Sequence, residues 1–368
     1  MGLDKGAIDG LLARARREVD DGLLPSAQVA LAYEGELVVF ETFGDATDDT
    51  SYVVFSATKA FVAGAMWALI GDGLVDVSKR VVDYVPEFAP NGQDVITVEQ
   101  VMLHTSGFPL APMPPLLGAT SEGRVERFAK WRLNWEPGTK YQYHPTSAHW
   151  VLAEIIERVT GQDFRDVVEQ RVTTPAGLPR VLSNQDVVAA ELILCGEHAS
   201  PDELEAVFGV RQLDVGEVTD EALVGFNDLA AQRVGVPGGG GVMRACDLAM
   251  YYQAVLHNPG EMWKPDVIDD VRSNVRNHLP DVMSGVPANR TLGLIQAGSD
   301  GKSHLRGMGH TVSPLAVGHN GAGGQIAWGD PATGVSLGYT TNGLDRHEIR
   351  EPRRTSGIAS AAGKVGVR

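Results

Sequence analysis

The chain of 368 residues is poor in cysteine and in positive charge. Its two cysteines, Cys195 and Cys246, lie far apart without metal-like spacing, so we expect free thiols in a reducing compartment. Lys and Arg number 31 against 47 Asp and Glu, which gives a formal net charge of −16. That charge disfavours nucleic acid, anionic membrane surfaces and polyanionic substrates as partners. No apolar run reaches the roughly 18 residues of a membrane span.

Several signature motifs are also absent. Residues 1–22 lack the continuous apolar stretch of a secretory signal peptide, so we expect a cytoplasmic protein. G-x-S-x-G does not occur, which disfavours an α/β-hydrolase. Gly238–Gly241 lacks the Lys-Ser ending of a phosphate loop, so we expect a tight backbone corner there. His144 and His149 do not have the spacing of H-E-x-x-H, and we expect neither a metal nor a cofactor.

The pattern of apolar residues predicts strands near both ends of the chain. Alternating runs at 27–33 and 36–43 are joined by Glu34-Gly35, which is typical of a β-hairpin. Short strands separated by turns are predicted at 314–318, 325–329 and 335–341, and a helix near 346–365 follows them. Helices are predicted at 4–21 (capped by Asp4), 96–103 (with a T-x-x-Q capping box), 121–131, 147–159 and 243–256.

This order of elements predicts an α+β fold instead of an alternating α/β one. One antiparallel sheet would be built from both chain ends, in a lobe of residues 1–55 and 310–368. Residues 56–309 would form a mostly helical lobe, intertwined with the first as a single unit. We expect the active site at the junction of the two.

The tetrapeptide Ser56-Ala57-Thr58-Lys59 stands where a strand-like run, 52–55, gives way to a helical pattern. Lys59 lies one turn after Ser56 on the same face of the predicted helix. A hydroxyl at a helix start lies beside unpaired backbone N–H groups, which favour developing negative charge. Lys59 can act as a base toward it only if burial or a nearby cation keeps the amine partly neutral. By itself S-x-x-K also fits an N-capping serine with a solvated lysine.

Four further segments follow in order. They are Leu103-His104-Thr105-Ser106-Gly107 after a short helix, the Trp135–His144 stretch before another, Pro237-Gly238-Gly239-Gly240-Gly241 before a helix that contains Asp247, and Gly318-His319-Asn320-Gly321-Ala322-Gly323-Gly324 before the last strands. Together with S-x-x-K they resemble the serine β-lactamase and penicillin-binding superfamily. The match is closest to the class C β-lactamase-like branch, which includes family VIII carboxylesterases and D-aminopeptidases. The resemblance covers roughly residues 5–345 and implies the β-lactamase/transpeptidase-like fold.

The resemblance implies a role for each matching residue. Ser56 would be the acyl-accepting nucleophile and Lys59 its proton partner. Tyr143 would fill the tyrosine position of the family's Y-x-N motif, with Tyr141 as the alternative phenol. His319-Asn320-Gly321 would stand where β-lactamases carry K-T-G, so that His319 and Gly321 contact substrate. The backbone N–H groups of Ser56 and Ala322 would form the oxyanion hole. His104 is expected to be a structural hydrogen-bond donor, and a structural role for His319 or Tyr143 stays open.

Two departures from the family pattern bear on the substrate. The Asn of Y-x-N is Pro145 here, and that asparagine normally binds a β-lactam side-chain amide. His319 in place of Lys removes most of a fixed positive charge at neutral pH. We therefore expect a serine hydrolase, a carboxylesterase that cleaves small, neutral esters through an acyl-enzyme. An amidase, a D-aminopeptidase or an acyltransferase would be close variants.

Two other functions remain open. The first is a β-lactamase or D-Ala-D-Ala carboxypeptidase-type enzyme, and the second is a catalytically silent relative that serves as a scaffold. In each catalytic case the expected partner is a small-molecule ester or amide, and the oligomeric state is not predicted.

The proline-rich stretch 108–119 is expected to be a lid or acyl-pocket wall, or else a packed connection.

Overall fold

A six-stranded antiparallel sheet organises the computed structural model, which describes residues 2–367. Its strands lie in the order β3-β2-β10-β9-β8-β7. The N-terminal hairpin pairs with the C-terminal β10 along its whole length, from Val335 opposite Tyr33 to Thr341 opposite Ala27. The predicted sheet from both chain ends is therefore confirmed. The strands are β2 (Ser26–Tyr33), β3 (Glu36–Gly44), β7 (Ile295–Gln296), β8 (Val317–Gly318), β9 (Ile326–Asp330) and β10 (Val335–Thr341).

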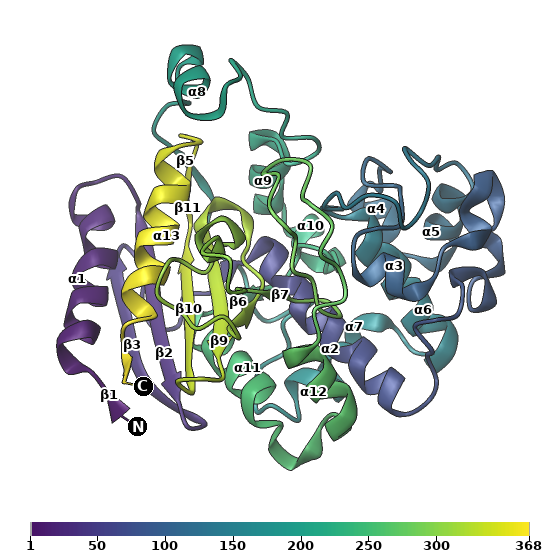
Figure 1. The fold of residues 1–368 in the computed structure, drawn as a ribbon, viewed down its shortest axis with the longest axis horizontal. Helices are drawn as coiled ribbons and strands as arrows, with labels where there is room; N and C mark the ends of the chain where they lie inside the picture. Colours follow the sequence, from purple (N-terminus) through teal and green to yellow (C-terminus); the bar gives the residue numbers. More distant parts are fainter. Residues whose placement is uncertain (1, 368) are drawn as a thin grey trace.

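Helices cover both faces of this sheet (Figure 1). On one face α1 (Lys5–Asp20) and α13 (Arg350–Ala362) lie side by side over a cluster that includes Val29 and Leu31 of β2. On the other face α11 (Ala245–His257) packs against the alternate residues of β2, Ala30 and Ala32. Successive side chains of a strand point to opposite faces, so one strand serves both layers. Gly338 of β10 has to be glycine, because a Cβ there would lie 2.0 Å from the carbonyl oxygen of Ala245.

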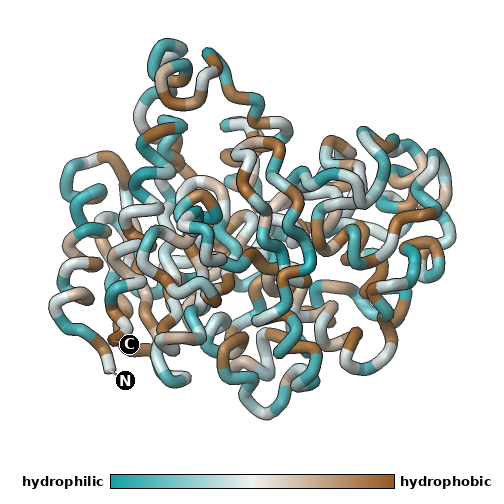
Figure 2. The backbone as a smooth tube through the Cα atoms, viewed as in Figure 1, coloured by the Kyte–Doolittle hydropathy of each residue, from teal (hydrophilic) through white to brown (hydrophobic). Residues whose placement is uncertain are grey.

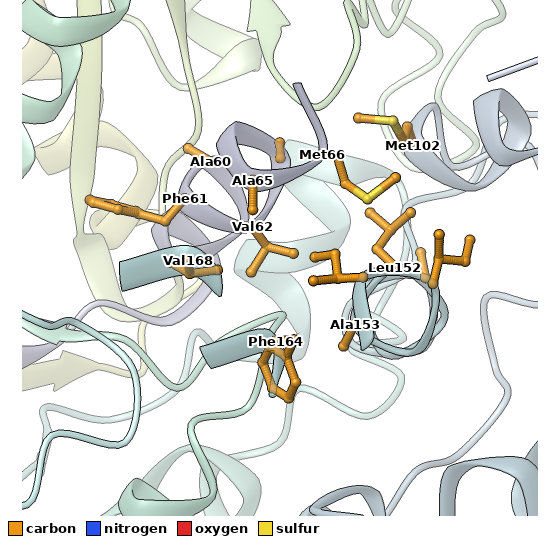
Figure 3. Packing of buried hydrophobic residues seen from close by; sticks show 14 of the residues in the cluster. Ala60, Phe61, Val62, Ala65, Met66, Met102, Leu152, Ala153, Phe164 and Val168 are labelled. Carbon is orange, nitrogen blue, oxygen red and sulfur yellow. The ribbon is translucent and has the colours of Figure 1, made fainter. Parts of the chain in front are cut away.

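A second lobe is built around α2 (Thr58–Gly71), which is buried on almost every side. A helix that is apolar all round needs neighbours on all faces, and Figure 3 shows residues from several elements meeting there. These elements are α3 (Val98–Met102), α5 (Ser121–Phe128), α6 (Ser147–Thr160), α7 (Phe164–Val168) and α12 (Pro265–Ser273). Leu248 and Tyr251 of α11 belong to the same cluster, so α11 links the two lobes. The boundaries given above for the two lobes stay a prediction. Within residues 56–309, β7 is a strand of the sheet and α11 packs on it.

Most predicted helices are confirmed, with their predicted caps. The Asp4 side chain accepts a hydrogen bond from the Ala7 N–H, and Thr97 and Gln100 form the capping box of α3. Gly161 ends α6 with a φ of 69°. One element was missed in the proline-rich stretch, where α4 (Pro115–Gly118) forms a single helical turn. Proline is compatible with a first helical turn, because the N–H that it lacks would have no partner there.

Residues 180–234, for which no pattern was assigned, contain β5 (Ile193–Cys195), α8 (Pro201–Phe208), α9 (Asp220–Val224) and α10 (Leu229–Val234). β5 pairs in parallel with β11 (Gly343–Asp345). α8 projects from the body at the top of Figure 1, and Figure 2 shows both hydrophilic and hydrophobic residues along it. The chain ends meet where β1 (Gly2–Leu3) pairs with β12 (Gly366–Val367). Within residues 2–367 no helix has both the length and the apolarity needed to cross a bilayer.

Candidate active site

Ser56 lies in a short 3₁₀ turn, Phe55–Ala57, and α2 begins only at Thr58. The predicted helix start at Ser56 is therefore two residues early. The reason is the backbone of Phe55, whose φ of 43° lies in the left-handed region that non-glycine residues rarely adopt. The turn is preceded by β4 (Tyr52–Val53), which pairs with β6 (Val242–Met243).

The glycine run Gly238–Gly241 forms the corner that the sequence predicted, packed directly against this turn. The Gly241 N–H donates to Thr58 Oγ1 at 2.9 Å, and its carbonyl accepts from the Val54 N–H at 2.9 Å. A Cβ on Gly241 would lie 2.7 Å from Thr58 Oγ1, so a larger residue would force the corner away. The run therefore serves close backbone approach.

Lys59 is completely buried, and its Nζ lies 3.1 Å from Ser56 Oγ. The amine also donates to two main-chain carbonyls, of Pro145 at 2.6 Å and of Gly238 at 2.5 Å. Burial, with the charge of Arg290 nearby, lowers the pKa of Lys59 to about 7. A neutral amine that gives both hydrogens to these carbonyls has its lone pair left for the Ser56 hydroxyl. The arrangement can thus take a proton from Ser56 near neutral pH.

Tyr143 borders this pair. Lys59 Nζ lies 5.1 Å from the centre of the Tyr143 ring, and the rings of His104 and Tyr143 are 4.8 Å apart. Burial raises the pKa of Tyr143, while Arg290 and the neighbouring Ser56 hydroxyl oppose that rise. Tyr141 is engaged elsewhere, because its hydroxyl accepts a hydrogen bond from Arg290 Nε at 3.1 Å.

The His104–Gly107 motif fixes the segment that carries Tyr143. His104 Nδ1 accepts a hydrogen bond from the His144 N–H at 3.1 Å, and the Thr105 carbonyl accepts from Gly138. Burial and nearby cationic groups hold the pKa of His104 well below its usual range, so the imidazole is neutral. The structure gives His104 a structural contact in which Nδ1 accepts, so the hydrogen of the neutral ring lies on Nε2. A Cβ on Gly107 would lie 2.4 Å from the Trp135 carbonyl oxygen, which explains this glycine.

The stretch after β8 approaches the Ser56 turn from the sheet side. A Cβ on Gly321 would lie 2.1 Å from the carbonyl oxygen of Val54, so the two backbones nearly touch. Ala322 follows, packed in the same cluster as Phe55. This approach brings the Ala322 backbone beside the turn that carries Ser56.

His319 stands at the edge of this stretch as a neutral imidazole. Burial, with Arg290 and Lys59 close by, holds its pKa well below the usual range. Its Nδ1 lies 3.0 Å from the Asn320 carbonyl oxygen, which requires the hydrogen on Nδ1 and leaves Nε2 as an acceptor. Nε2 is buried and has no hydrogen-bond partner among residues 2–367.

The site contains one cavity of about 770 Å³. Ser56, Tyr143, His319, Gly321 and Ala322, which come from three distant segments, all line it. Met113 and Pro115 of the proline-rich stretch form part of its wall, so that stretch contributes to the pocket. Much of the remaining wall is apolar, with Val218, Leu223, Phe226, Val236, Val286 and Ile295.

Two charged residues of the cavity had no signal in the sequence. Arg290 is only 3% exposed, takes part in no ion pair, and has an Nη1 without a hydrogen-bond partner within the described chain. Its backbone is held by two hydrogen bonds with Asn277, both of 3.1 Å. Glu217 lies on a loop before α9 and accepts hydrogen bonds from the N–H and the Oγ1 of Thr146. Neither position stands in a recognisable motif, because each reaches the site only through the folding of its loop.

Comparison with known proteins gives the family. A family model described as Beta-lactamase matches residues 11–361. The chain belongs to the Beta-lactamase family. This is a family of hydrolases, and the resemblance predicted from the motifs is thereby confirmed.

Three known proteins illustrate the similarity. The protein described as "Esterase/beta-lactamase LipL" of Mycobacterium tuberculosis (strain ATCC 25618 / H37Rv) is 29% identical over 324 residues, which cover 80% of this chain and 70% of that protein. The crystal structure of a novel penicillin-binding protein homolog from Caulobacter crescentus has a TM-score of 0.78 at 23% identity, with 98% of both chains covered. A family VIII carboxylesterase has a TM-score of 0.74 at 24% identity, again with 98% of both chains covered. These structures share the β-lactamase/transpeptidase-like fold predicted above.

Proposed function

We propose that the protein is a serine hydrolase that cleaves small carboxylic esters through an acyl-enzyme on Ser56. The observation that carries this proposal is the buried Lys59 amine, 3.1 Å from Ser56 Oγ, with a pKa lowered to about 7. A lysine in that state is a base at neutral pH, whereas a solvated capping arrangement would leave the amine charged.

The reaction would proceed in two halves. In the first, Lys59 takes the Ser56 proton, Oγ bonds to the ester carbonyl carbon, and the carbonyl electrons form an oxyanion held by the N–H groups of Ser56 and Ala322. The oxyanion collapses, the carbon–alkoxide bond breaks, and the alcohol leaves with the proton relayed through Tyr143. In the second half, the Tyr143–Lys59 pair takes a proton from water. The hydroxide attacks the acyl carbon, and Ser56 regains its proton as the acid departs.

Tyr143 is the phenol we favour for this relay. Lys59 lies against its ring, and its pKa responds to the Ser56 hydroxyl, whereas the hydroxyl of Tyr141 is bonded to Arg290. His319 and Gly321 would border the bound ester as contact residues. The neutral imidazole of His319 and the backbone of Gly321 suit a substrate that carries no charge at that position.

The choice of an ester rests on the walls of the cavity and on relatives. The lining is mostly apolar, and Pro145 presents no side-chain amide to a β-lactam side chain. The relative LipL is described as an esterase/beta-lactamase, and one structural neighbour is a family VIII carboxylesterase. A cytoplasmic location would accord with the two cysteines, both buried free thiols.

A β-lactamase or D-Ala-D-Ala carboxypeptidase-type activity is the second candidate. Arg290 favours it, because this buried guanidinium lines the cavity without an ion pair and could bind a substrate carboxylate. It supplies a cation that the neutral His319 does not.

One experiment compares these possibilities. Purified protein is given p-nitrophenyl butyrate and nitrocefin in parallel, with Ser56→Ala as the control and intact mass recorded during turnover. We expect ester hydrolysis that the substitution abolishes, an acyl adduct on the unsubstituted protein, and little turnover of nitrocefin. Fast turnover of nitrocefin would favour the second candidate. No turnover and no adduct with either compound would refute the mechanism and leave a scaffold.

A further inference from the structure

The cavity holds an acidic group that the reaction described above does not use. Glu217 lines the same space as Ser56 and Tyr143, and is partly buried. Its Oε1 accepts two hydrogen bonds from Thr146, at 3.1 Å from the N–H and 2.9 Å from Oγ1. Both bonds fall on one oxygen, and no hydrogen bond within residues 2–367 reaches Oε2.

Among the described residues, no Lys, Arg or His forms an ion pair with Glu217. The charge of Lys59 affects the pKa of Glu217, but the Lys59 amine is directed at Ser56 and at two carbonyl oxygens. Burial raises the pKa of Glu217, and the Thr146 hydrogen bonds, with the charge of Lys59, oppose that rise. A carboxylate in a partly apolar wall gains from a partner that brings a positive charge, and more than it would in water.

A second hydrogen-bond acceptor in the cavity, on His319, also has no donor. His319 is 4% exposed and lines the same cavity, and its Nε2 is an acceptor with no partner among the described residues. Buried acceptors are normally satisfied, so an unpaired one in a ligand cavity points to a donor carried by the ligand. The cavity therefore presents two acceptors, one of them charged, to a substrate that must supply N–H or O–H groups.

The charges around the cavity indicate which kind of hydrogen-bond donor the substrate would carry. Asp281 and Glu221 also line the cavity, and the whole chain carries a formal net charge of −16. Two arginines line the cavity, and one of them, Arg306, is ion-paired with Asp300. The other, Arg290, has its guanidinium carbon 5.3 Å from the Tyr143 ring centre and 5.7 Å from that of Tyr141. An ammonium group would thus be attracted to Glu217 and repelled by Arg290.

We propose that Glu217 binds a protonated amine of the substrate, so that the enzyme selects amino esters or amino amides over uncharged acyl compounds of the same shape. This rests on the proposed function, because it assigns the substrate of the same Ser56 site. Glu217 acts as a specificity-determining residue and takes no part in bond making.

The test uses pairs of p-nitrophenyl esters that differ only in an ammonium or a methyl group: 3-aminopropanoate against butanoate, and 6-aminohexanoate against heptanoate. We expect kcat/KM to favour at least one amino ester by about tenfold over its partner, the worth of one charge-assisted hydrogen bond. Glu217→Gln keeps an acceptor for Thr146 but removes the charge, and should abolish this preference. Because the charge of Glu217 also raises the pKa of Lys59, the measured quantity is the ratio of kcat/KM between the two esters of a pair within one variant. Glu122→Gln, at an exposed glutamate outside the cavity, should behave as the unsubstituted protein. An unchanged preference in Glu217→Gln, or no preference in the unsubstituted protein, would overturn the proposal.

A binding measurement separates failure of this proposal from failure of the proposed function. Methyl 6-aminohexanoate and methyl heptanoate are titrated calorimetrically into Ser56→Ala, with and without Glu217→Gln. If no ester is hydrolysed but the amine binds about tenfold more weakly to the doubly substituted protein, the esterase reading fails and the amine site stands. If esters are hydrolysed and neither measurement responds to Glu217→Gln, the amine site fails and the esterase stands.

Discussion

The guanidinium carbon of Arg290 lies 5.3 Å from the centre of the Tyr143 ring, in a cavity where His319 is a neutral imidazole. Arg290 lowers the pKa of Tyr143 against the effect of burial, and it also contributes to the lowered pKa of Lys59. One residue thus acts on both members of the proposed proton relay. It makes a phenolate less unfavourable and keeps the lysine closer to neutrality.

Replacing Arg290 should therefore slow the reaction and change its pH profile. For Arg290→Gln we expect kcat/KM toward p-nitrophenyl butyrate to fall by about 10–100-fold at pH 7, the scale on which removal of one preorganised charge or donor acts. Arg290→Lys should recover part of the loss, because it restores the charge. The measurement is kcat/KM from pH 5 to 10. Arg127→Gln, at a half-buried arginine of α5 outside the cavity, is the control. A pH profile of Arg290→Gln that coincides with that of the unsubstituted protein would argue for a purely structural Arg290.

The pKa of Lys59 sets a second expectation. Below about pH 7 the amine is protonated and cannot accept the Ser56 proton, whereas above that pH it is neutral. We therefore expect kcat/KM to rise with pH through about 7 and then to level off. Lys59→Ala should lower kcat by about 1,000-fold or more, as removal of a residue of such a catalytic unit does. A rate that is flat from pH 5 to 9 would mean that Lys59 is not the base.

Gly321 offers a test of the backbone approach behind the proposed oxyanion hole. A Cβ there would lie 2.1 Å from the Val54 carbonyl oxygen, so Gly321→Ala must push the backbone of Ala322 away from Ser56. We expect activity to fall by about 100-fold or more, since one oxyanion donor is worth that much, together with a lower Tm. Gly10→Ala is the matched control, because nothing lies within 4 Å of its added Cβ in α1. That variant should gain about 0.5–1 kcal/mol of stability from helix propensity. Full activity in Gly321→Ala would contradict the assignment of Ala322.

The acyl wall can be tested at Phe226. Its ring lies 5.8 Å from that of Phe55, the residue before Ser56, and it lines the cavity. Phe226→Ala should enlarge the space available to the acyl chain. We expect the ratio of kcat/KM for the octanoate ester to that for the butanoate ester to rise by about tenfold, as one or two further buried methylenes would give. Phe208→Ala, on the exposed end of α8, should leave the ratio unchanged. A ratio that moves equally in both variants would place the acyl chain elsewhere.

Local patterns determined much of the fold. The alternation of β2 and β3, the Asp4 and Thr97 caps and the αL glycine after α6 are all decided by residues close in sequence, and the structure confirms them. The motif order also identified the family, because S-x-x-K, H-T-S-G and G-H-N-G stand at the places where the chain enters one site. The short α4 and the two-residue strands β6 and β7 escaped prediction, since so few residues carry no readable period.

The charges of the site were decided by tertiary structure alone. Whether Lys59 is neutral depends on complete burial between two carbonyls from distant segments, and no local signal reports that burial. Arg290 and Glu217 reach the cavity from loops with no motif of their own, so nothing in the sequence separated them from the other charged residues. By itself the sequence determined which residues could react, since spacing and motif order are local properties. The folded chain decided their protonation and their neighbours, because pKa values and ion pairing depend on what packs around a group in three dimensions.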